Sequence, residues 1–356
     1  GVHPLEHKEV TAKLPIRRLA FAPELTIPLA QHIGAPAKPL VHKGQEVVRG
    51  QPIAAAQGLV SVPMHAPATG VDKAIELRPT AAGPKTEAIV IDVYEGDSQE
   101  VLYEAPRDMD RLSPAEILQA VQDCGMVGQG GAAFPSHVKL KLPEGKTADT
   151  LVVNGCECEP YLTCDHRIML EQTADVLAGA RIIMRALRVG RAMIGVEDNK
   201  LDAVKALRGR IAEDAELNRG ISVHAVQTKY PQGAEKMLIE SLLHRQVPTG
   251  GLPMDVGVAV FNVGSLAQLG QLLRQRVETL VRIVVEDAEA ERGLRAAGNE
   301  QPQPESDHER IQMLSAIRAS IAKTSSNMEI DPPSQTASGP PTSSNRATPV
   351  SQVGTP

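Results

Sequence analysis

The sequence of 356 residues has few aromatic side chains, with no tryptophan, three phenylalanines and four tyrosines. Cysteine is also scarce: the chain has four, and three of them fall between Cys156 and Cys164. A secreted protein that depended on disulfides would carry paired cysteines along its length, so this pattern favours a reducing compartment. The first residue is Gly1 and not methionine, and we expect the native start and any targeting segment to lie upstream.

Two further absences narrow the function. The formal net charge is -6, and no basic stripe of the kind that binds nucleic-acid phosphates is visible. No run of about 18 apolar residues occurs, so the sequence predicts no membrane span. The chain does have 42% hydrophobic residues, which is enough for sizeable cores, and its length suggests two or three domains.

The first domain is predicted to span residues 1–105. Residues 1–26 are Pro-rich and irregular, and short β-branched runs separated by glycine turns follow over residues 27–93. Residues 38–54 contain two such turns, and residues 65–71 repeat the pattern, which predicts a small all-β sandwich. The rhythm is similar to that of the lipoyl/biotinyl carrier fold. A working carrier needs an exposed lysine at a hairpin tip, and the corresponding tip at residues 58–61 has none. We therefore predict a structural or docking domain here, without a covalent cofactor.

Apolar strands and helices alternate within residues 106–264. The segment opens on Ser113-Pro114-Ala115-Glu116, a capping box with proline at the first helical position, and the helix is expected to end at Cys124 before Gly125. We predict strands over residues 150–154, 192–196, 221–226 and 256–261, and helices over residues 165–187, 201–211 and 233–243. This order implies a parallel sheet that is covered on both faces and binds ligands beyond the carboxyl ends of its strands.

The C-terminal part has a different character. Residues 265–298 are predicted to form a divergent amphipathic helical segment, whose apolar face is more typical of packing than of docking to a membrane partner. Residues 299–356 are rich in Pro, Ser, Thr, Gln and Asn, and we predict that they are disordered.

The most informative pattern is the glycine-rich run at residues 128–135 (GQGGAAFP), which precedes a helix and Lys139. Glycines let backbone N–H groups approach a phosphate, and a helix start adds partial positive charge. About twenty residues later, residues 154–160 (NGCECEP) place acidic groups that suit ribose hydroxyls at a strand end. The alternatives are a plain helix-entry turn, a solvated lysine and ordinary surface acids. We interpret the whole set as a nucleotide or flavin phosphate site.

The cysteine cluster gives a weaker signal. The spacing of Cys156, Cys158 and Cys164 fits neither a ferredoxin nor a zinc ribbon, so we predict no metal site. Cys124, just before a helix-ending glycine, is expected to be a small core residue.

Several segments, taken in order, give the chain a family resemblance. They are residues 1–4 (GVHP), 15–19 (PIRRL), 31–39 (QHIGAPAKP), 65–67 (HAP), 130–135 (GGAAFP), 154–160 (NGCECEP), 230–235 (YPQGAE), 248–253 (PTGGLP) and 261–264 (FNVG). Over residues 1 to about 264 the chain resembles RnfC, the C-type subunit of the Rnf (Rsx) electron transport complex. Its second part is similar to the FMN- and NADH-binding flavoprotein subunit of respiratory complex I. The resemblance implies an α/β protein: an all-β barrel-sandwich hybrid domain followed by a Rossmann-like FMN/NADH-binding domain.

The resemblance also implies the cofactors FMN and NADH and assigns residues to them. Gly128, Gly130, Gly131 and Lys139 would hold the FMN phosphate or ribityl chain, and Asn262 would lie by the phosphate. Asn154, Glu157 and Glu159 would contact flavin or the nicotinamide ribose. Phe134 would stack against NADH, and Tyr230, Gly233 and Glu235 would lie by the flavin ring. Since the flavin itself accepts the hydride, no side chain is predicted to be catalytic.

A peripheral subunit at the cytoplasmic face of the bacterial inner membrane is implied, with the other membrane subunits of the complex and ferredoxin as partners. The family continues into cysteine runs that bind two [4Fe–4S] clusters, whereas this sequence has no cysteine after Cys164. The sequence therefore does not identify the group that would accept electrons from the flavin. Two alternatives stand beside an NADH-oxidising subunit: a non-catalytic docking subunit or truncated paralogue, and a cobalamin-reductase type of flavoprotein.

Overall fold

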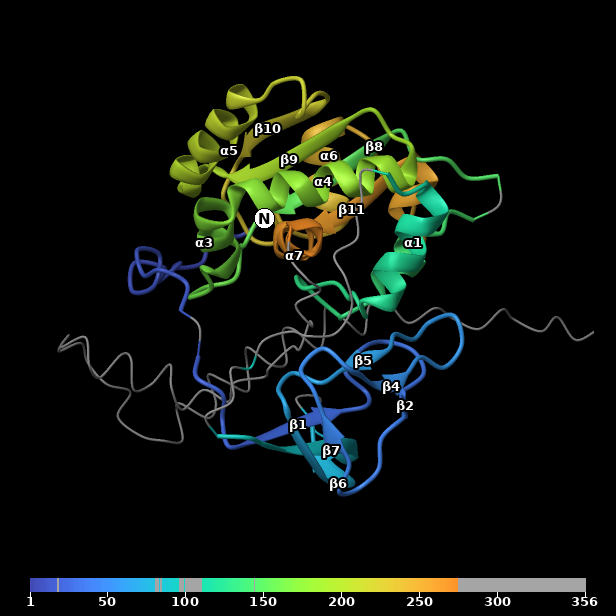
Figure 1. The fold of residues 1–356 in the computed structure, drawn as a ribbon. Coiled ribbons are helices and arrows are strands. Elements are labelled where there is room, and N and C mark those ends of the chain that lie inside the picture. Colours follow the sequence, from blue (N-terminus) through green and yellow to red (C-terminus); the bar gives the residue numbers. More distant parts are fainter. Residues whose placement is uncertain are drawn as a thin grey trace, which may run out of the picture. The chain divides into compact units, whose positions relative to one another are not determined.

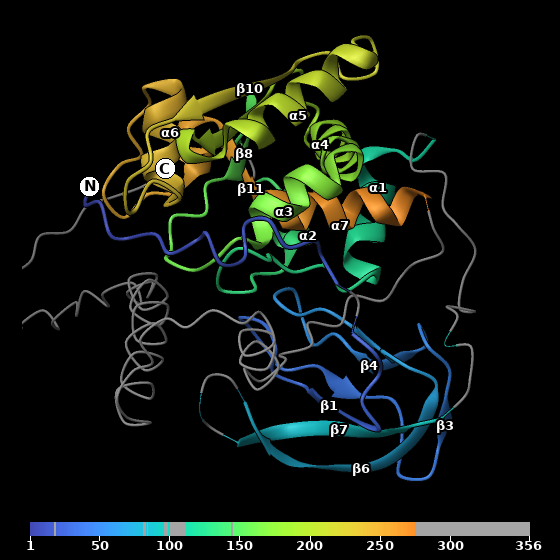
Figure 2. The same cartoon turned by 90° about the vertical axis from the view of Figure 1, so that its left-hand side faces the viewer.

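The computed structural model describes residues 1–17, 19–80, 83, 85–95, 99, 111–143 and 145–274. In its first part, two antiparallel sheets form a sandwich (Figures 1 and 2). One sheet has the order β1-β7-β6-β3 and the other β2-β4-β5. Their bounds are β1 (Glu24–Pro28), β2 (Lys38–Pro39), β3 (Glu46–Val47), β4 (Pro52–Ala55), β5 (Met64–His65), β6 (Gly70–Pro79) and β7 (Lys85–Val93). The all-β prediction for this part is confirmed.

Aliphatic residues and alanines fill the space between these two sheets. Ile53 of β4 and Ile89 and Ile91 of β7 are fully buried, as are Ala66 and Ala68 between β5 and β6. No aromatic side chain belongs to this cluster of described residues, so the sheets pack through small and branched groups. The paired strands β6 and β7 approach closely at Gly70, where an added Cβ would lie 2.2 Å from the Asp92 carbonyl oxygen.

The second part is a four-stranded parallel sheet of order β10-β9-β8-β11 with helices on both faces. Its strands are β8 (Thr150–Gly155), β9 (Ala192–Glu197), β10 (Ile221–Val226) and β11 (Val258–Asn262). Its helical elements are α1 (Pro114–Asp123), α2 (Ser136–Leu140), α3 (Cys164–Glu171), α4 (Thr173–Leu187), η1 (Asp198–Lys200), α5 (Leu201–Glu213), α6 (Glu235–Leu243), η2 (Pro253–Val256) and α7 (Val263–Arg274). The predicted parallel, covered sheet is confirmed.

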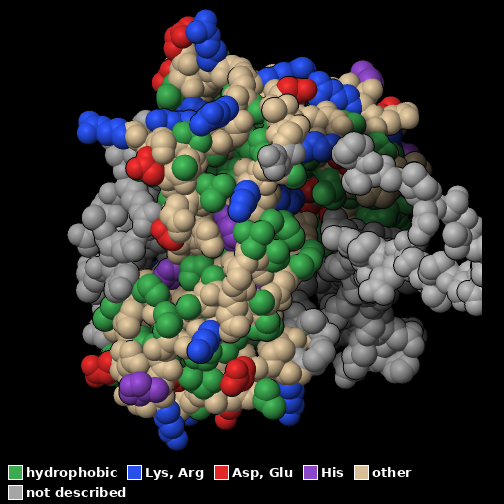
Figure 3. Space-filling model, turned by 90° about the vertical axis from the view of Figure 1, so that its right-hand side faces the viewer, with side chains coloured by type: hydrophobic (Ala, Val, Ile, Leu, Met, Phe, Trp, Pro, Cys, Tyr) green, Lys and Arg blue, Asp and Glu red, His purple; other side chains and the backbone are tan. Residues whose placement is uncertain are grey.

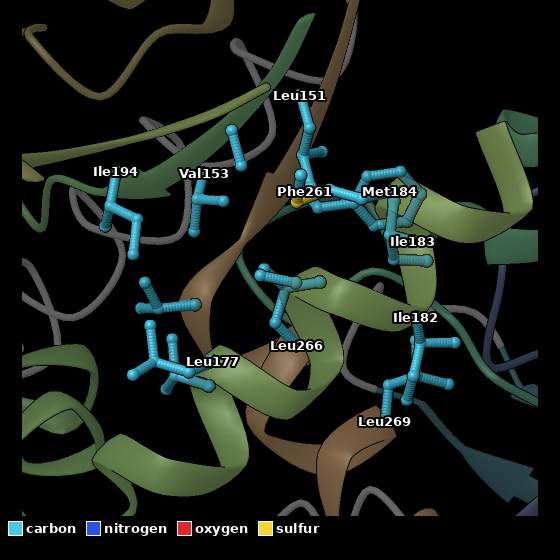
Figure 4. Close-up of a cluster of buried hydrophobic side chains, with 14 of the residues drawn as sticks. Leu151, Val153, Leu177, Ile182, Ile183, Met184, Ile194, Phe261, Leu266 and Leu269 are labelled. Carbon is cyan, nitrogen blue, oxygen red and sulfur yellow. The ribbon is translucent and has the colours of Figure 1, made fainter. Parts of the chain in front are cut away.

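Strand alternation assigns each apolar residue to one of two cores. Leu151 and Val153 of β8 join the core with α4 and α7, while Val152 joins the core beneath α6. Side chains alternate along a strand, so a strand buried on both faces is continuously apolar. Figure 4 shows the first core, with Leu177 of α4 and Leu266 of α7 gathered against the strand residues.

Glycine allows α4 and α7 to approach closely. A Cβ on Gly179 of α4 would lie 2.0 Å from the Leu266 carbonyl oxygen, and one on Gly270 of α7 would lie 1.9 Å from that of Asp175. No larger residue fits at either point unless the helices move apart. The N-terminus of α7 is thereby held against the body of this part, which fixes one wall of the site described below.

One predicted helix differs from the structure in more than its end residues. The helix predicted over residues 165–187 is wrong as a single element, because the chain leaves helical geometry at Gln172 (φ -123°, ψ 29°) and forms α3 and α4. The Thr173 hydroxyl bonds the carbonyls of Met169 and Leu170, which satisfies the end of α3. The capping box at Ser113 and Glu116 is confirmed, with bonds of 3.3 and 2.8 Å.

The structure confirms α7 at the start of the segment predicted to be helical after residue 264. The remainder of that segment, and the tail predicted to be disordered, lie outside the described residues. Figure 3 shows one face of the molecule, on which basic and acidic side chains are interspersed among apolar ones. Among the helices of the described residues, none is long and apolar enough to span a membrane.

The first 17 residues, here termed the N-terminal arm, are largely irregular and contact the parallel-sheet part of the chain (Figure 2). Val2 forms an antiparallel bridge with Tyr230, with N···O distances of 2.9 and 2.7 Å. At the other end of the arm, the Ile16 backbone N–H donates to the Glu171 carboxylate at 3.1 Å. The arm therefore follows the edge of the sheet at which the parallel strands end.

Candidate functional site

The candidate site lies where the parallel strands end. Asn154 lies near the end of β8, Asn262 ends β11, and Glu197 ends β9. Because parallel strands finish at one edge, residues that are more than 100 positions apart in the chain meet there. Two loops border this edge. They are the glycine-rich loop, residues 127–135, and the acidic loop, residues 156–163, which joins β8 to α3.

Backbone contacts close the glycine-rich loop on itself. Val127 and Pro135 form an antiparallel bridge, and the Gly128 N–H donates to the Phe134 carbonyl at 2.9 Å. The Gln129 N–H donates to the Ser265 hydroxyl of α7 at 2.9 Å, which attaches the loop tip to that helix. The Phe134 side chain is half-buried, and its predicted stacking against NADH stays a prediction.

Gly130 and Gly131 differ in their surroundings. An added Cβ on Gly130 would lie 2.7 Å from Nδ2 and 3.0 Å from Cβ of Asn262, whereas one on Gly131 would have no atom within 4 Å. Asn262 has little freedom to move, because its Oδ1 accepts the Gly264 N–H at 2.8 Å and its Nδ2 donates to Asp165 at 2.6 Å. The loop therefore presses one glycine against a fixed amide and leaves the other in open space.

Asn262 connects three elements at this point. Its Oδ1 caps the start of α7, and its Nδ2 reaches Asp165 in the first turn of α3. The starts of two helices and the glycine-rich loop thus converge on one side chain. The first N–H groups of the two helices are bonded to Asn262 and to Glu157, so the attraction for an anion at this point comes from the helix dipoles.

Lys139 and Glu235 form an ion pair at the rim of the site. Lys139 is in α2, Glu235 is the first residue of α6, and Nζ and Oε1 are 2.8 Å apart. The two side chains are 35% and 30% exposed, so water screens the pair and its net contribution to stability is small. The lysine predicted to hold phosphate and the acid predicted to lie by the flavin ring are therefore brought together.

Asn154 connects the acidic loop to the loop that carries Tyr230 and Gly233. Its Nδ2 donates to the Gly233 carbonyl at 2.7 Å, and its Oδ1 accepts the Cys156 N–H at 3.0 Å. An added Cβ on Gly233 would lie 2.8 Å from the Cys156 carbonyl oxygen. Tyr230 is half-buried and precedes Pro231 through a cis peptide bond. These two segments are therefore in direct contact.

The two predicted ribose-binding acids have different environments. Glu159 is exposed, while Glu157 is 3% exposed and points inward. The Glu157 carboxylate accepts the Asp165 N–H at 2.9 Å and the Cys164 thiol at 3.0 Å, so it caps α3. The group that caps α3 lies seven residues before the first residue of the helix, so no local sequence motif marks the cap. A contact between Glu157 and a ribose stays a prediction.

Burial perturbs the titration of several groups around this cap. It raises the pKa of Asp165 to about 7, with the Glu157 charge adding to the effect and the Asn262 hydrogen bond opposing it. Burial also raises the pKa of Cys158 to about 11 and the pKa of Cys156 well above that of an ordinary thiol. Cys164 is exposed as a residue, and its thiol pKa is raised by local desolvation and by the charges of Asp165 and Glu157. The three thiols are therefore protonated at neutral pH.

Glu157, Cys164 and Asp165 form a group whose potential ligand atoms lie within 4.8 Å of one another. The cysteine pattern singled out in the sequence contributes one member to it, since Cys156 and Cys158 are not included. The contacts within the group are those of a helix cap: the thiol and the Asp165 N–H both donate to Glu157.

Sequence reasoning missed a buried ion pair next to the acidic loop. Lys200 and Glu197 are 1% and 0% exposed, with Nζ and Oε2 2.6 Å apart. Oε2 of Glu197 also accepts the Glu157 N–H at 3.1 Å, and Oε1 is buried without a hydrogen-bond partner. An acid at the end of a predicted apolar strand was a usable signal for Glu197.

Comparisons with known proteins identify both parts of the chain. Residues 1–96 match the family described as RnfC barrel sandwich hybrid domain, and residues 121–271 match the Nuo51 FMN-binding domain. The C-type subunit of the Na+-translocating ferredoxin:NAD+ oxidoreductase complex of Acetobacterium woodii is 43% identical over 272 residues, 76% of this chain. The chain belongs to the RnfC family. Its predicted fold, a barrel-sandwich hybrid domain followed by an FMN-binding parallel-sheet domain, is confirmed.

Other members of the RnfC family are similar over the same region. The corresponding subunit of the proton-translocating ferredoxin:NAD+ oxidoreductase complex of Clostridium ljungdahlii is 42% identical over 80% of this chain. That of the ion-translocating oxidoreductase complex of Pseudomonas aeruginosa is 39% identical over 77% of it. The chain spans 60% and 61% of the first two relatives and 36% of the third. A solved NAD+-reducing [NiFe]-hydrogenase in its H2-reduced state is 26% identical, with a TM-score of 0.40, over 46% of this chain and 31% of that one.

Proposed function

We propose that this chain binds FMN at the carboxyl edge of the parallel sheet, where NADH reduces the flavin. Electrons would then pass toward iron–sulfur centres and ferredoxin. The chain would act as a peripheral subunit of an ion-translocating complex at the cytoplasmic face of the bacterial inner membrane, alongside the membrane subunits of that complex. The names of its relatives and the FMN-binding domain match support this assignment.

The observation that carries the proposal is the contact between Gly130 and Asn262. A methyl group at position 130 would occupy space that lies 2.7–3.0 Å from three atoms of that side chain, while position 131 is open. The glycine at position 130 therefore lets the loop pack against Asn262 at the strand end, and the open space at position 131 leaves the loop backbone accessible to a ligand. We infer that FMN binds at this loop, with Gly130, Gly131 and Asn262 beside its phosphate; the open space at Gly131 supports this placement.

The remaining predicted residues have polar groups suited to orienting two planar ligands. Asn154 keeps one amide N–H beyond the bond to Gly233 and could donate it to the flavin. Glu159, which is exposed, could accept from ribose hydroxyls of NADH. Lys139 would exchange its contact with Glu235 for a phosphate oxygen. Bound FMN supplies the two-electron chemistry, and these residues fix the distance and angle between the reactants.

Transfer of electrons away from the flavin requires iron–sulfur clusters. A [4Fe–4S] cluster needs four thiolates, and the four cysteines here include two that are buried in the fold. We therefore assign the accepting clusters to polypeptide outside these 356 residues, whether in a partner or in a longer chain.

Anaerobic visible spectroscopy of the chain reconstituted with FMN tests the proposal. We expect stoichiometric flavin retention after gel filtration and bleaching of the flavin band by NADH. Gly130→Ala should lower flavin affinity at least tenfold, whereas Gly209→Ala on α5, where an added Cβ meets no atom within 4 Å, should leave it unchanged. Flavin that is retained but not bleached by NADH would contradict the oxidoreductase assignment.

The second candidate function is a docking subunit that transfers no electrons. Two observations favour it: Lys139 is already paired with Glu235, and Glu157 is committed to capping α3. Absence of flavin retention in the experiment above, with the wild-type fold intact by circular dichroism, would select this alternative.

A further inference from the structure

The N-terminal arm buries one lysine in the acidic loop. Lys8 is 9% exposed, and its Nζ donates to the carbonyl oxygens of Glu157 at 2.8 Å and Glu159 at 2.9 Å. It also donates to the Leu162 carbonyl at 2.5 Å. An ammonium has three N–H donors, and each here has one backbone acceptor. These acceptors lie about 150 residues further along the chain, so the contact joins two distant segments.

Three carbonyl oxygens that converge on one point repel one another unless a cation lies between them. The Lys8 ammonium therefore sets the curvature of the acidic loop. Without it, the Glu157 carbonyl would lose its shortest contact and keep the longer one to Lys200 at 3.5 Å. Buried acceptors left without donors are costly, so the loop would rearrange toward water.

The loop contains a residue in an unfavourable backbone conformation, and the arm contacts it. Tyr161 has φ 68°, in the left-handed region that a bulky aromatic residue rarely adopts. Its N–H donates to the Glu6 carbonyl at 2.8 Å, and its ring stacks on His7 with centroids 5.0 Å apart. The Thr11 and Thr163 hydroxyls bond at 2.9 Å a few residues further on. The arm thus contacts the loop at its strained residue and on both sides of it.

The arm also reaches the other segments that border the site. The Glu6 carboxylate accepts from the Asn199 side chain at 2.8 Å, and Val2 pairs with Tyr230. Every predicted nucleotide-contacting residue between positions 157 and 233 therefore lies in or next to a segment that the arm contacts.

The arm also contributes a positive charge to the acidic loop. Four carboxyl groups cluster here (Glu157, Glu159, Asp165 and Glu197), and among the described residues Lys8 and Lys200 are buried near them. Burial lowers the pKa of Lys8, as does the charge of Lys200, while the three nearby glutamates oppose this. The ammonium thus balances part of the negative charge that the site concentrates.

We propose that the N-terminal arm is an integral part of the nucleotide site and that Lys8 is a positioning residue, which sets the conformation of the acidic loop and hence of Glu159. This inference rests on the proposed function for its link to NADH. Its structural half, control of the loop by Lys8, is independent of that function and is tested separately.

The experiment compares Lys8→Met with Lys8→Arg and with Lys13→Met, which removes an exposed lysine from the same arm. Amide hydrogen exchange of the full chain without ligand is the first readout. Lys8→Met should speed exchange at Tyr161 at least tenfold, Lys8→Arg should do so less, and Lys13→Met should match wild type. Unchanged exchange in the acidic loop of Lys8→Met would overturn the proposal, whether or not the chain oxidises NADH.

The second readout is flavin reduction in the FMN-loaded variants. Lys8→Met should raise the NADH concentration for half-maximal reduction about tenfold, leave the saturating rate within threefold and keep FMN retention. Equal losses of flavin retention and thermal stability, without rescue by Lys8→Arg, would indicate general destabilisation and overturn the positioning role. If wild type itself is not reduced by NADH, the proposed function fails, and the exchange result alone decides whether Lys8 shapes the loop.

Discussion

The glycine-rich loop and the acidic loop border the same sheet edge, yet different forces hold them. The glycine-rich loop is fixed by backbone hydrogen bonds, by one hydroxyl from Ser265 and by the close approach of Gly130 to Asn262. The acidic loop is fixed by buried charges, with Lys8 and Lys200 on its carbonyls and Glu197 on its N–H. Substitutions that add side-chain volume should therefore disturb the glycine-rich loop most. Substitutions that remove a charge, and changes of pH, should disturb the acidic loop most.

Removing the Glu197 carboxylate should have the largest effect. Glu197→Ala leaves the Lys200 ammonium buried without its counter-charge and removes the acceptor of the Glu157 N–H. Breaking such a pair from one side destabilises a protein by about 3–5 kcal/mol. Chemical denaturation measures this, with Glu216→Ala, the loss of an exposed acid, as the control. A loss below about 1 kcal/mol would show that buried charge does not hold the acidic loop.

The second prediction concerns pH and Asp165. Its pKa is about 7 in the folded protein, above the ordinary 3.8, because of burial and the Glu157 charge. The folded protein therefore retains a proton that the unfolded chain releases, so this group makes the free energy of unfolding fall as pH rises from about 4 to 7. The loss should be on the order of 1–4 kcal/mol.

Asp165→Asn isolates this contribution. Burial lowers the pKa of His137 and His224, so these groups also make stability depend on pH, and the informative quantity is the difference between wild type and variant. Unfolding measured across this range should show the two curves converging toward low pH. Parallel curves would mean that Asp165 is already ionised at about pH 4 in the fold.

The third prediction addresses the glycine-rich loop. Ser265→Ala removes the hydroxyl that accepts the Gln129 N–H, which should cost about 1–2 kcal/mol. Because no charge is involved, the cost should be the same in mildly acidic and mildly alkaline buffer, unlike that of Asp165. A cost that changes with pH would connect the two loops electrostatically and weaken the contrast between them.

The smallest effect is expected at the rim. Lys139 and Glu235 are both about one-third exposed, so a double-mutant cycle with Lys139→Met and Glu235→Gln should give a coupling of about 0–1 kcal/mol that falls with added salt. FMN affinity in the Lys139→Met variant should nevertheless drop several-fold. A strong coupling energy without any change in FMN affinity would indicate that the ion pair stabilises the fold and does not bind FMN.

The fold was predictable because short apolar strands alternate with helices along the sequence and because turns and caps have local motifs. The apolar runs at β8, β9, β10 and β11 carry enough signal for a covered parallel sheet, and the capping box at Ser113 is a local motif. The break at Gln172 escaped prediction because both flanking segments have helical periodicity. The decisive bond there, from Thr173 back into the last turn of α3, leaves no sequence signature of its own.

The candidate site was predictable only in part. Gly130 and Asn262 were singled out separately, and their contact depends on the sheet order, which brings β11 beside β8. Glu157 was predicted as a ligand contact from its residue type, but its orientation depends on how α3 begins. Lys8 had no signal, since its three acceptors are backbone carbonyls about 150 residues away.

The strand order also has a consequence for how the chain folds. β8 and β11 are the first and last strands of the parallel sheet in sequence, yet they are neighbours in it, and α7 packs against α4 through Gly179 and Gly270. During synthesis, the earlier strands leave the ribosome well before the segment that completes their core. Closing such a long loop is slow, and the uncovered apolar face would need protection meanwhile. Stalled chains that end before Gly257 should therefore be the form most dependent on chaperones.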